Sequence, residues 1–360
     1  MFSPVDHAMM TRALELAEKG LCTAKPNPMV GCVIAKNDQI IAEGFHARAG
    51  EAHAEVNALA AAGGKARGAT AYVTLEPCAH TGRTPPCSDA LVRAGITRVV
   101  AALSDPFSSV AGRGFTALAA AGITTEEGLL AESARWLNRG FFSRTTKGRP
   151  WVRLKMAMSL DGRTALASGE SKWISGEAAR ADVQHWRARS CAILTGLNTV
   201  LTDNPSLTVR DPQLQSCVHP IRVVLDTKGR IPAASNVLDS SVTTLLVHAD
   251  DTVPDYRSDA QGFAVRRING HLDLAAVMTQ LGQREINEVQ VEAGSLLASG
   301  LLQAELIDEL LLYVAPVLLG DLGRPLFADC NPLNMSERIG FRIRQAQMMG
   351  DDLRLILTRN

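Results

Sequence analysis

One histidine, two cysteines and one glutamate follow each other along the first quarter of the chain in an order that suits a catalytic metal centre. His53 and Glu55 are two residues apart, and Cys78 and Cys87 each come directly after a proline. One imidazole and two thiolates give Zn²⁺ three protein ligands and leave its fourth position for water, which is typical of catalytic sites. Zinc lowers the pKa of such a water to about 7. Glu55 is then placed to carry the released proton to a leaving amine.

The two cysteines are further apart than in the general deaminase pattern. Zinc deaminases of nucleobases carry H-x-E followed by P-C-x-x-C, whereas the eight residues AHTGRTPP separate Cys78 from Cys87 here. The insert is polar and turn-rich, and Pro86 at its end is typical of a helix start, where the macrodipole would stabilise the Cys87 thiolate. A closed structural site with His80 as fourth ligand is the alternative. The ordered combination of motifs favours the catalytic interpretation.

Helix-like and strand-like segments alternate around these residues. The spacing predicts helices over Val5–Lys19, Ala52–Ala62, Pro86–Ala94 and Gly112–Ala121, and strands over Met29–Lys36, Ile40–Phe45, Ala69–Leu75 and Arg98–Leu103. The first two strands are expected to form a hairpin. Such alternation predicts an α/β sandwich with a largely parallel sheet.

A basic stretch of small residues, Ser143–Pro150, separates this region from a second patterned one, and we place the domain boundary there, with domains 1–146 and 147–360. No G-x-G-x-x-G follows a strand in the second domain, so a Rossmann site is not supported. The Gly112–Gly114 turn (GRG) belongs to the first domain and is set aside as a helix start. In the second domain we predict helices over Gly176–Arg189 and Ala293–Gln303 and strands over Trp151–Met158, Ala192–Thr195, Ile221–Leu225, Thr243–Val247, Glu288–Val291 and Leu310–Val314.

Composition bounds the class of protein. The 360 residues suit two domains, and 46% apolar with 21% charged residues is an ordinary globular balance. Lys plus Arg equals Asp plus Glu at 37 each and aromatic residues are 4%, which argues against a nucleic-acid partner. The apolar run Leu310–Gly320 is well short of the roughly 20 residues of a membrane helix. With no secretory signal visible and seven thinly spread cysteines, a cytoplasmic enzyme is expected.

Three motifs of the first domain resemble the pyrimidine deaminase of riboflavin biosynthesis. They are PNPMVGCVI (Pro26–Ile34), HAEVNAL (His53–Leu59) and TLEPCAHTGRTPPC (Thr74–Cys87), and the long insert between the cysteines is a feature of that family. The resemblance implies a cytidine-deaminase-like α/β/α sandwich, one zinc ion per chain and 2,5-diamino-6-(ribosylamino)pyrimidinone 5'-phosphate as substrate. Asn27 is expected to hydrogen-bond the ribose or ring. His46 and Arg83 are candidates for binding polar or phosphate groups of the substrate at the mouth of the active site, or else they are solvated surface residues.

Four motifs of the second domain resemble the reductase of the same pathway, which has a dihydrofolate-reductase-like fold and uses NADPH. They are LKMAMSLDGRTA (Leu154–Ala165), SGESKWIS (Ser168–Ser175), TGLNTVLTDNPSLTVR (Thr195–Arg210) and VEAGSLLASGLL (Val291–Leu302). The resemblance implies cofactor contacts from Ala157, Trp173, Thr199, Asp203, Gly294, Ser295, Leu296, Leu297, Ala298, Ser299 and Gly300. It implies substrate contacts from Ser171, Arg187, Leu207, Arg210 and Glu292. The two arginines suit a phosphate bidentately, and Lys155 has no settled role.

The two resemblances cover nearly the whole chain in the order of the bifunctional bacterial riboflavin enzymes, whose family implies a homo-oligomer, dimer or tetramer, acting on a small phosphorylated pyrimidine. Three alternatives stay open from the residues alone. The chain could be a nucleic-acid deaminase with an appended binding domain, a non-enzymatic scaffold stabilised by zinc, or a deaminase whose second domain is degenerate.

Overall fold

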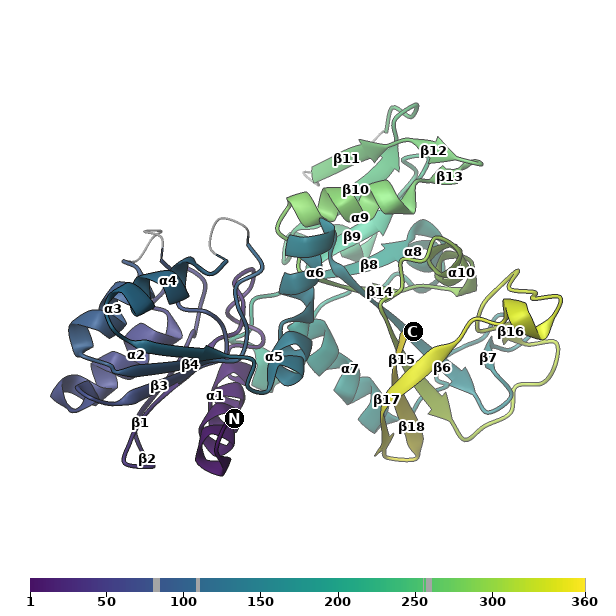
Figure 1. Ribbon diagram of the computed structural model, residues 1–360. Coiled ribbons are helices and arrows are strands. Elements are labelled where there is room, and N and C mark those ends of the chain that lie inside the picture. The colour runs from purple at the N-terminus through teal and green to yellow at the C-terminus, as the bar shows by residue number, and fades with distance from the viewer. Residues whose placement is uncertain (80–84, 108–110, 255, 257–260, 360) are drawn as a thin grey trace. The chain divides into compact units, whose positions relative to one another are not determined.

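The computed structural model describes residues 1–79, 85–107, 111–254, 256 and 261–359. It divides into two compact units, Met1–Gly148 and Arg149–Asn360 (Figure 1). No helix among these described residues is long and apolar enough to cross a membrane.

The first unit is a three-layer α/β/α sandwich around a five-stranded sheet of order β2-β1-β3-β4-β5. Residues of α2, α3 and α4 pack on one face of this sheet, whereas residues of α1, α5 and α6 pack on the other (Figure 1). The strands are β1 (Gly31–Lys36), β2 (Gln39–Phe45), β3 (Thr70–Val73), β4 (Arg98–Ala101) and β5 (Thr124–Glu127). The helices are α1 (Pro4–Glu18), α2 (Ala54–Ala62), α3 (Cys87–Ala94), α4 (Arg113–Ala120), α5 (Ala131–Leu137) and α6 (Arg139–Lys147).

Strand β1 shows why both layers are needed. Its residues Cys32 and Ile34 enter one apolar cluster and Val33 and Ala35 enter the other, because successive side chains of a strand point to opposite faces. The sheet is mixed rather than largely parallel, which corrects the sequence prediction. Strand β1 runs antiparallel to both β2 and β3, and only β3, β4 and β5 are mutually parallel.

The stretch Ser143–Pro150, in which we placed the domain boundary, is mostly helical. Most of that stretch is the second half of α6, which is anchored by the buried rings of Phe141 and Phe142. The hydroxyls of Thr145 and Thr146 donate to the carbonyls four residues earlier, so these two polar groups are satisfied within the helix. The helix ends at Gly148, whose left-handed conformation (φ 69°) is the usual helix terminator.

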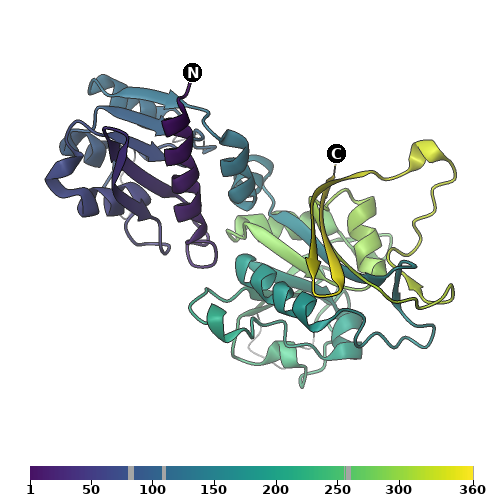
Figure 2. The ribbon, with the colours of Figure 1, turned by 90° about the horizontal axis from the view of Figure 1, so that it is seen from below.

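The second unit is built on a nine-stranded sheet of order β11-β10-β9-β8-β14-β6-β15-β18-β17. In this order, the first seven strands, β11 through β15, are mutually parallel. At the β15 side, β18 and β17 add an antiparallel hairpin, yellow in Figure 2. The strands are β6 (Trp151–Ser159), β8 (Ala192–Gly196), β9 (Ile221–Leu225), β10 (Thr244–Ala249), β11 (Gln261–Val265), β14 (Glu288–Glu292), β15 (Glu309–Ala315), β17 (Phe341–Met349) and β18 (Asp352–Arg359). The helices are α7 (Glu177–Arg189), α8 (Leu197–Asp203), α9 (Leu274–Gln283) and α10 (Ser295–Gln303), and the short pairs β7 (Arg163–Ala165) with β16 (Arg324–Pro325) and β12 (Arg267–Ile268) with β13 (His271–Leu272) complete the unit.

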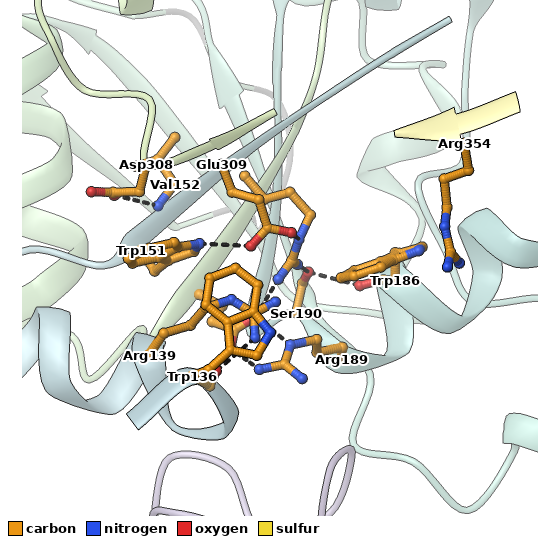
Figure 3. Close-up of polar contacts among 12 residues, drawn as sticks. Trp136, Arg139, Trp151, Val152, Trp186, Arg189, Ser190, Asp308, Glu309 and Arg354 are labelled. Carbon is orange, nitrogen blue, oxygen red and sulfur yellow. Dashed lines mark hydrogen bonds and ion pairs between the residues drawn. The ribbon is translucent and has the colours of Figure 1, made fainter. Parts of the chain in front are cut away.

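A buried ion network ties the centre of this sheet together near the start of its strands (Figure 3). The Arg153 guanidinium, fully inaccessible, donates to Glu309 at 2.8 Å and to Glu288 at 2.7 Å. Arg189, from the end of α7, donates to the same Glu288 at 2.7 Å, and Trp151 donates its indole N–H to Glu309 at 2.9 Å. Three strands and one helix are thereby held in fixed register, while the opposite strand ends remain for the residues expected to bind ligands.

Candidate active sites

The three predicted zinc ligands converge although they come from three different elements. His53 is the N-cap of α2, Cys78 follows β3, and Cys87 is the first residue of α3. His53 Nδ1 lies 3.3 Å from Cys87 Sγ and 3.6 Å from Cys78 Sγ, and all three ligand atoms lie within 4.8 Å of one another. With Zn–S near 2.3 Å and Zn–N near 2.0 Å, a tetrahedral site needs N···S separations of roughly 3.5 Å. The donor set and its spacing therefore fit zinc.

The two thiols share a hydrogen bond that favours the thiolate at Cys78. This bond, followed by the one with His53, lowers the pKa of Cys78, and the same thiol–thiol bond raises the pKa of Cys87. The backbone N–H of Cys87, at the start of α3, also points at Cys78 Sγ at 3.4 Å. The carbonyl of Cys78 accepts the N–H and the hydroxyl of Ser88, each at 3.2 Å. The metal-binding loop and the first turn of α3 are thus one hydrogen-bonded unit.

Glu55 lies in the first turn of α2 and is only 3% exposed. Burial raises the pKa of its carboxyl to about 7, since a charged carboxylate is poorly solvated there. A bound zinc dication would oppose this shift by favouring the charged form. A carboxyl whose pKa lies near neutrality can both take up and return a proton, which is what a general acid–base residue needs.

Asn27 and His46 form a chain that ends next to the metal ligand. The Asn27 amide donates to His46 Nε2 at 3.0 Å, and His46 Nδ1 donates to the Ala52 carbonyl at 3.1 Å, which defines a neutral ring. The His46 ring also meets the His53 ring edge-on at 5.4 Å. His46 is 3% exposed, so it is not a solvated surface residue. Arg83 and His80 lie outside the described residues.

Charged residues predicted for the second site meet at the carboxyl ends of the parallel strands. Arg187 of α7 makes a two-pronged contact with Glu292, at 2.7 and 2.8 Å, at the end of β14. Burial would raise the pKa of Glu292, but Arg187 and Lys155 outweigh it and lower that pKa to about 2. Lys155 itself is half-buried on β6, and desolvation lowers its pKa although Glu292 opposes this. These three residues form one compact charged group.

Sequence reasoning missed two residues beside this group. The ring centre of Tyr313 on β15 lies 5.8 Å from the Lys155 ammonium nitrogen. The Tyr313 hydroxyl donates a hydrogen bond to Asp182 of α7 at 2.6 Å. Arg354 of the hairpin strand β18 donates to the same carboxylate at 2.9 Å. A lone tyrosine inside an apolar strand is a weak signal, and only the packing of α7 against β15 and β18 gives it a partner.

The residues expected to contact NADPH lie on neighbouring elements of the same unit. Thr199 and Asp203 belong to α8, Gly294 is the N-cap of α10, and Ser295 to Gly300 form the first turns of that helix. Trp173 is 71% exposed, and the Arg180 guanidinium covers its ring at 4.8 Å. Ala157 lies on β6. Of the residues expected at the substrate, Leu207 is buried, Arg210 is exposed and donates its backbone N–H to Gln184 of α7, and Ser171 lies in the segment before α7.

Comparisons with known proteins agree with this two-part architecture. Residues 3–103 match the model of the cytidine and deoxycytidylate deaminase zinc-binding region, and residues 150–355 match the RibD C-terminal domain. The fold and the sites thus define a two-domain protein in which a zinc-type deaminase precedes a reductase domain.

Full-length relatives make the assignment specific. The chain is 46% identical to the riboflavin biosynthesis protein RibD of Escherichia coli, with 98% of this chain and 99% of that protein covered, and 45% identical to that of Haemophilus influenzae, with 99% and 98% covered. The solved structure of Acinetobacter baumannii RibD has a TM-score of 0.91 at 45% identity and 99% coverage of both chains. The deaminase/reductase of Thermotoga maritima has a TM-score of 0.90 at 34% identity, again with 99% of both chains covered. The chain belongs to the RibD family, the bifunctional deaminases and reductases of riboflavin biosynthesis.

Proposed function

We propose that the first unit deaminates 2,5-diamino-6-(5-phosphoribosylamino)pyrimidin-4(3H)-one hydrolytically at a zinc centre. The second unit then reduces the ribosyl group of the product, 5-amino-6-(5-phosphoribosylamino)uracil, to a ribityl chain with NADPH. The observation that carries this proposal is the convergence of His53, Cys78 and Cys87 beside the buried carboxyl of Glu55.

In the deaminase, the chain supplies metal ligands and proton transfer. His53, Cys78 and Cys87 hold zinc, which when bound lowers the pKa of a water molecule so that it can attack as hydroxide. Glu55 takes up the proton of that water and delivers it to the departing amine, so that water and substrate yield ammonia and the uracil product. The Asn27–His46 chain fixes the residue just before His53, and Asn27, His46 and Arg83 are our candidates for contacts with the substrate.

In the reductase, the chain orients two ligands against each other. Ala157, Trp173, Thr199, Asp203 and the segment Gly294–Gly300 would hold NADPH. When bound, it would supply a hydride to the ribosyl C1' as the C1'–O4' bond breaks and the released ring oxygen takes a proton from solvent. Ser171, Arg187, Leu207, Arg210 and Glu292 bind the substrate. The exposed Arg210 suits its 5'-phosphate because a guanidinium group binds phosphate bidentately, whereas the Arg187 guanidinium is paired with Glu292. We also propose that the enzyme is a cytoplasmic homo-oligomer, dimer or tetramer, acting on charged small molecules rather than on nucleic acid or membranes.

A coupled assay tests the proposal and its alternatives. Ammonia release from the free phosphorylated pyrimidine, followed by NADPH oxidation that depends on the deaminated product, is the expected result. Release from RNA instead would favour a nucleic-acid deaminase. Ammonia release without any NADPH oxidation would identify the second domain as degenerate, and neither activity in a zinc-loaded, folded protein would favour a scaffold.

A further inference from the structure

Glu76 is a buried carboxylate two residues before a proposed zinc ligand, and its side chain accepts hydrogen bonds from the backbone of a distant segment. The residue is 4% exposed. Its Oε2 accepts the backbone N–H groups of Asp105 and Gly112, each at 3.0 Å, and its Oε1 accepts the N–H of Gly114 at 2.9 Å. One side chain therefore joins the Pro77-Cys78 turn to a segment that lies far along the chain.

The charge of Glu76 suits this position. Gly112 is the N-cap of α4, and no side-chain hydrogen bond from its own segment caps that helix. Glu76 supplies the missing acceptor from a different element, at the helix end where negative charge is favourable. Removing the carboxylate would take the Glu76 acceptor away from three main-chain N–H groups. One of them, Gly114 N–H, is buried, and a buried donor that loses its acceptor lowers stability.

The glycines of the Gly112–Gly114 turn, which the sequence left without a role, are what allow this contact. Gly112 has φ +75°, a conformation that side chains disfavour. A Cβ at Gly114 would lie 2.0 Å from the Pro77 carbonyl oxygen. The first turn of α4 therefore rests directly on the backbone between Glu76 and Cys78.

We propose that Glu76 is a positioning residue of the zinc site. It orients Cys78 by holding the backbone of residues Glu76–Cys78 against the first turn of α4. The hydrogen bonds from Ser88 to the Cys78 carbonyl hold the other side of the same turn. With both sides fixed, the thiolate is held in place before the metal arrives, and zinc binding does not have to order the turn. The inference rests on the proposed ligation of zinc by Cys78.

The test measures zinc release from the full-length, zinc-loaded protein to a coloured chelator at a temperature far below unfolding. Outer partners of metal ligands typically change metal affinity or activity by roughly 10–100-fold. We expect zinc release to be faster by roughly that factor in Glu76→Ala. We expect the same in Gly114→Ala, which disrupts the contact between Glu76 and α4 from the side of the helix. Glu76→Gln, which keeps one acceptor oxygen, should fall between wild type and Glu76→Ala. In the cobalt-substituted protein, the thiolate-to-metal absorption should broaden or shift in the same order.

Asp6→Asn is the matched control. Asp6 is another buried carboxylate of the first unit. It forms hydrogen bonds with Ser3, Tyr72 and Arg98, none of which is a proposed zinc ligand. Its loss should lower the melting temperature without speeding zinc release. Unchanged release in Glu76→Ala and Gly114→Ala, or an equal acceleration in Asp6→Asn, would overturn the inference. A wild-type protein that binds no zinc would overturn the proposed ligation itself, which is a distinct result.

Discussion

Replacing Glu55 by glutamine keeps the size of the side chain and removes its ability to carry a proton. General acid–base catalysis typically contributes 10²–10⁴-fold, or about 2.7–5.4 kcal/mol at 1.36 kcal/mol per tenfold. Because Glu55 is only 3% exposed, bulk water has little access to replace it. We therefore expect deaminase kcat to fall by the upper part of that range, roughly 10³–10⁴-fold.

The pH dependence gives the same experiment a second readout. Glu55 accepts a proton only as the carboxylate, and burial raises its pKa to about 7, a shift that bound zinc opposes. Wild-type deaminase kcat/KM should therefore decline as the pH falls through the pKa of Glu55 in the zinc-loaded enzyme. The small residual activity of Glu55→Gln should lack this acid limb.

The assay is ammonia release from the phosphorylated pyrimidine, measured with zinc content and with reductase activity on the deaminated product. We expect one zinc per chain and normal reductase activity in Glu55→Gln, so that only proton transfer is lost. A zinc-loaded variant that keeps deaminase kcat within threefold of wild type would refute the reasoning. Loss of zinc from the variant would show instead that Glu55 helps to bind the metal.

Further outcomes can be measured on the same protein. Chelation of zinc should abolish ammonia release and spare NADPH oxidation with the deaminated product; loss of both would contradict separate sites. Arg187→Lys should raise the reductase KM by roughly 10–100-fold, since one or two charge-assisted hydrogen bonds are lost, and an unchanged KM would remove Arg187 from the substrate site. Arg153→Met should lower the free energy of unfolding of the second unit by about 3–5 kcal/mol, because it breaks a buried ion pair by removing one partner and Glu309 loses its 2.8 Å contact with Arg153; urea unfolding followed by tryptophan fluorescence measures this, and a change below about 1 kcal/mol would contradict it. Arg98 holds the pKa of Asp6 well below its usual range, so this carboxylate stabilises the fold above its unfolded pKa, near 4, and that contribution is lost as pH falls toward the folded pKa. The melting temperature should thus drop in acid less steeply in Asp6→Asn than in wild type.

Local patterns were sufficient wherever a feature depends on neighbours in the sequence. The segment His53–Glu55 places a ligand and a carboxyl on one helix start, since two residues at the head of a helix share a region of space. The strand Ile221–Leu225 was predicted with its observed bounds, because a short apolar run that is followed by turn residues marks both ends of a buried strand. The family motifs are also contiguous, and the fold and bifunctional activity that they imply are confirmed.

Features without a local pattern were missed or misjudged. Helix α6 was not predicted, because the helical state of its polar half depends on the packing of Phe141 and Phe142. Strand β17 was not predicted, since most of its residues are exposed on both faces and show no alternation, and only pairing with β18 defines it as a strand. Helix α9 was also overlooked although its buried face is apolar.

The chemistry of both sites was encoded in residue types, but the contacts that tune it were decided by the tertiary structure. Sequence alone named His53, Cys78 and Cys87 as a ligand set, while the turn that holds Cys78 depends on Glu76 reaching the start of α4. Likewise Arg187 and Glu292 were each expected at a substrate, yet their mutual ion pair joins residues 105 positions apart. Hydrogen bonds and charge interactions act over a few ångströms of space, so folding sets their partners and the sequence supplies only the groups that can take part.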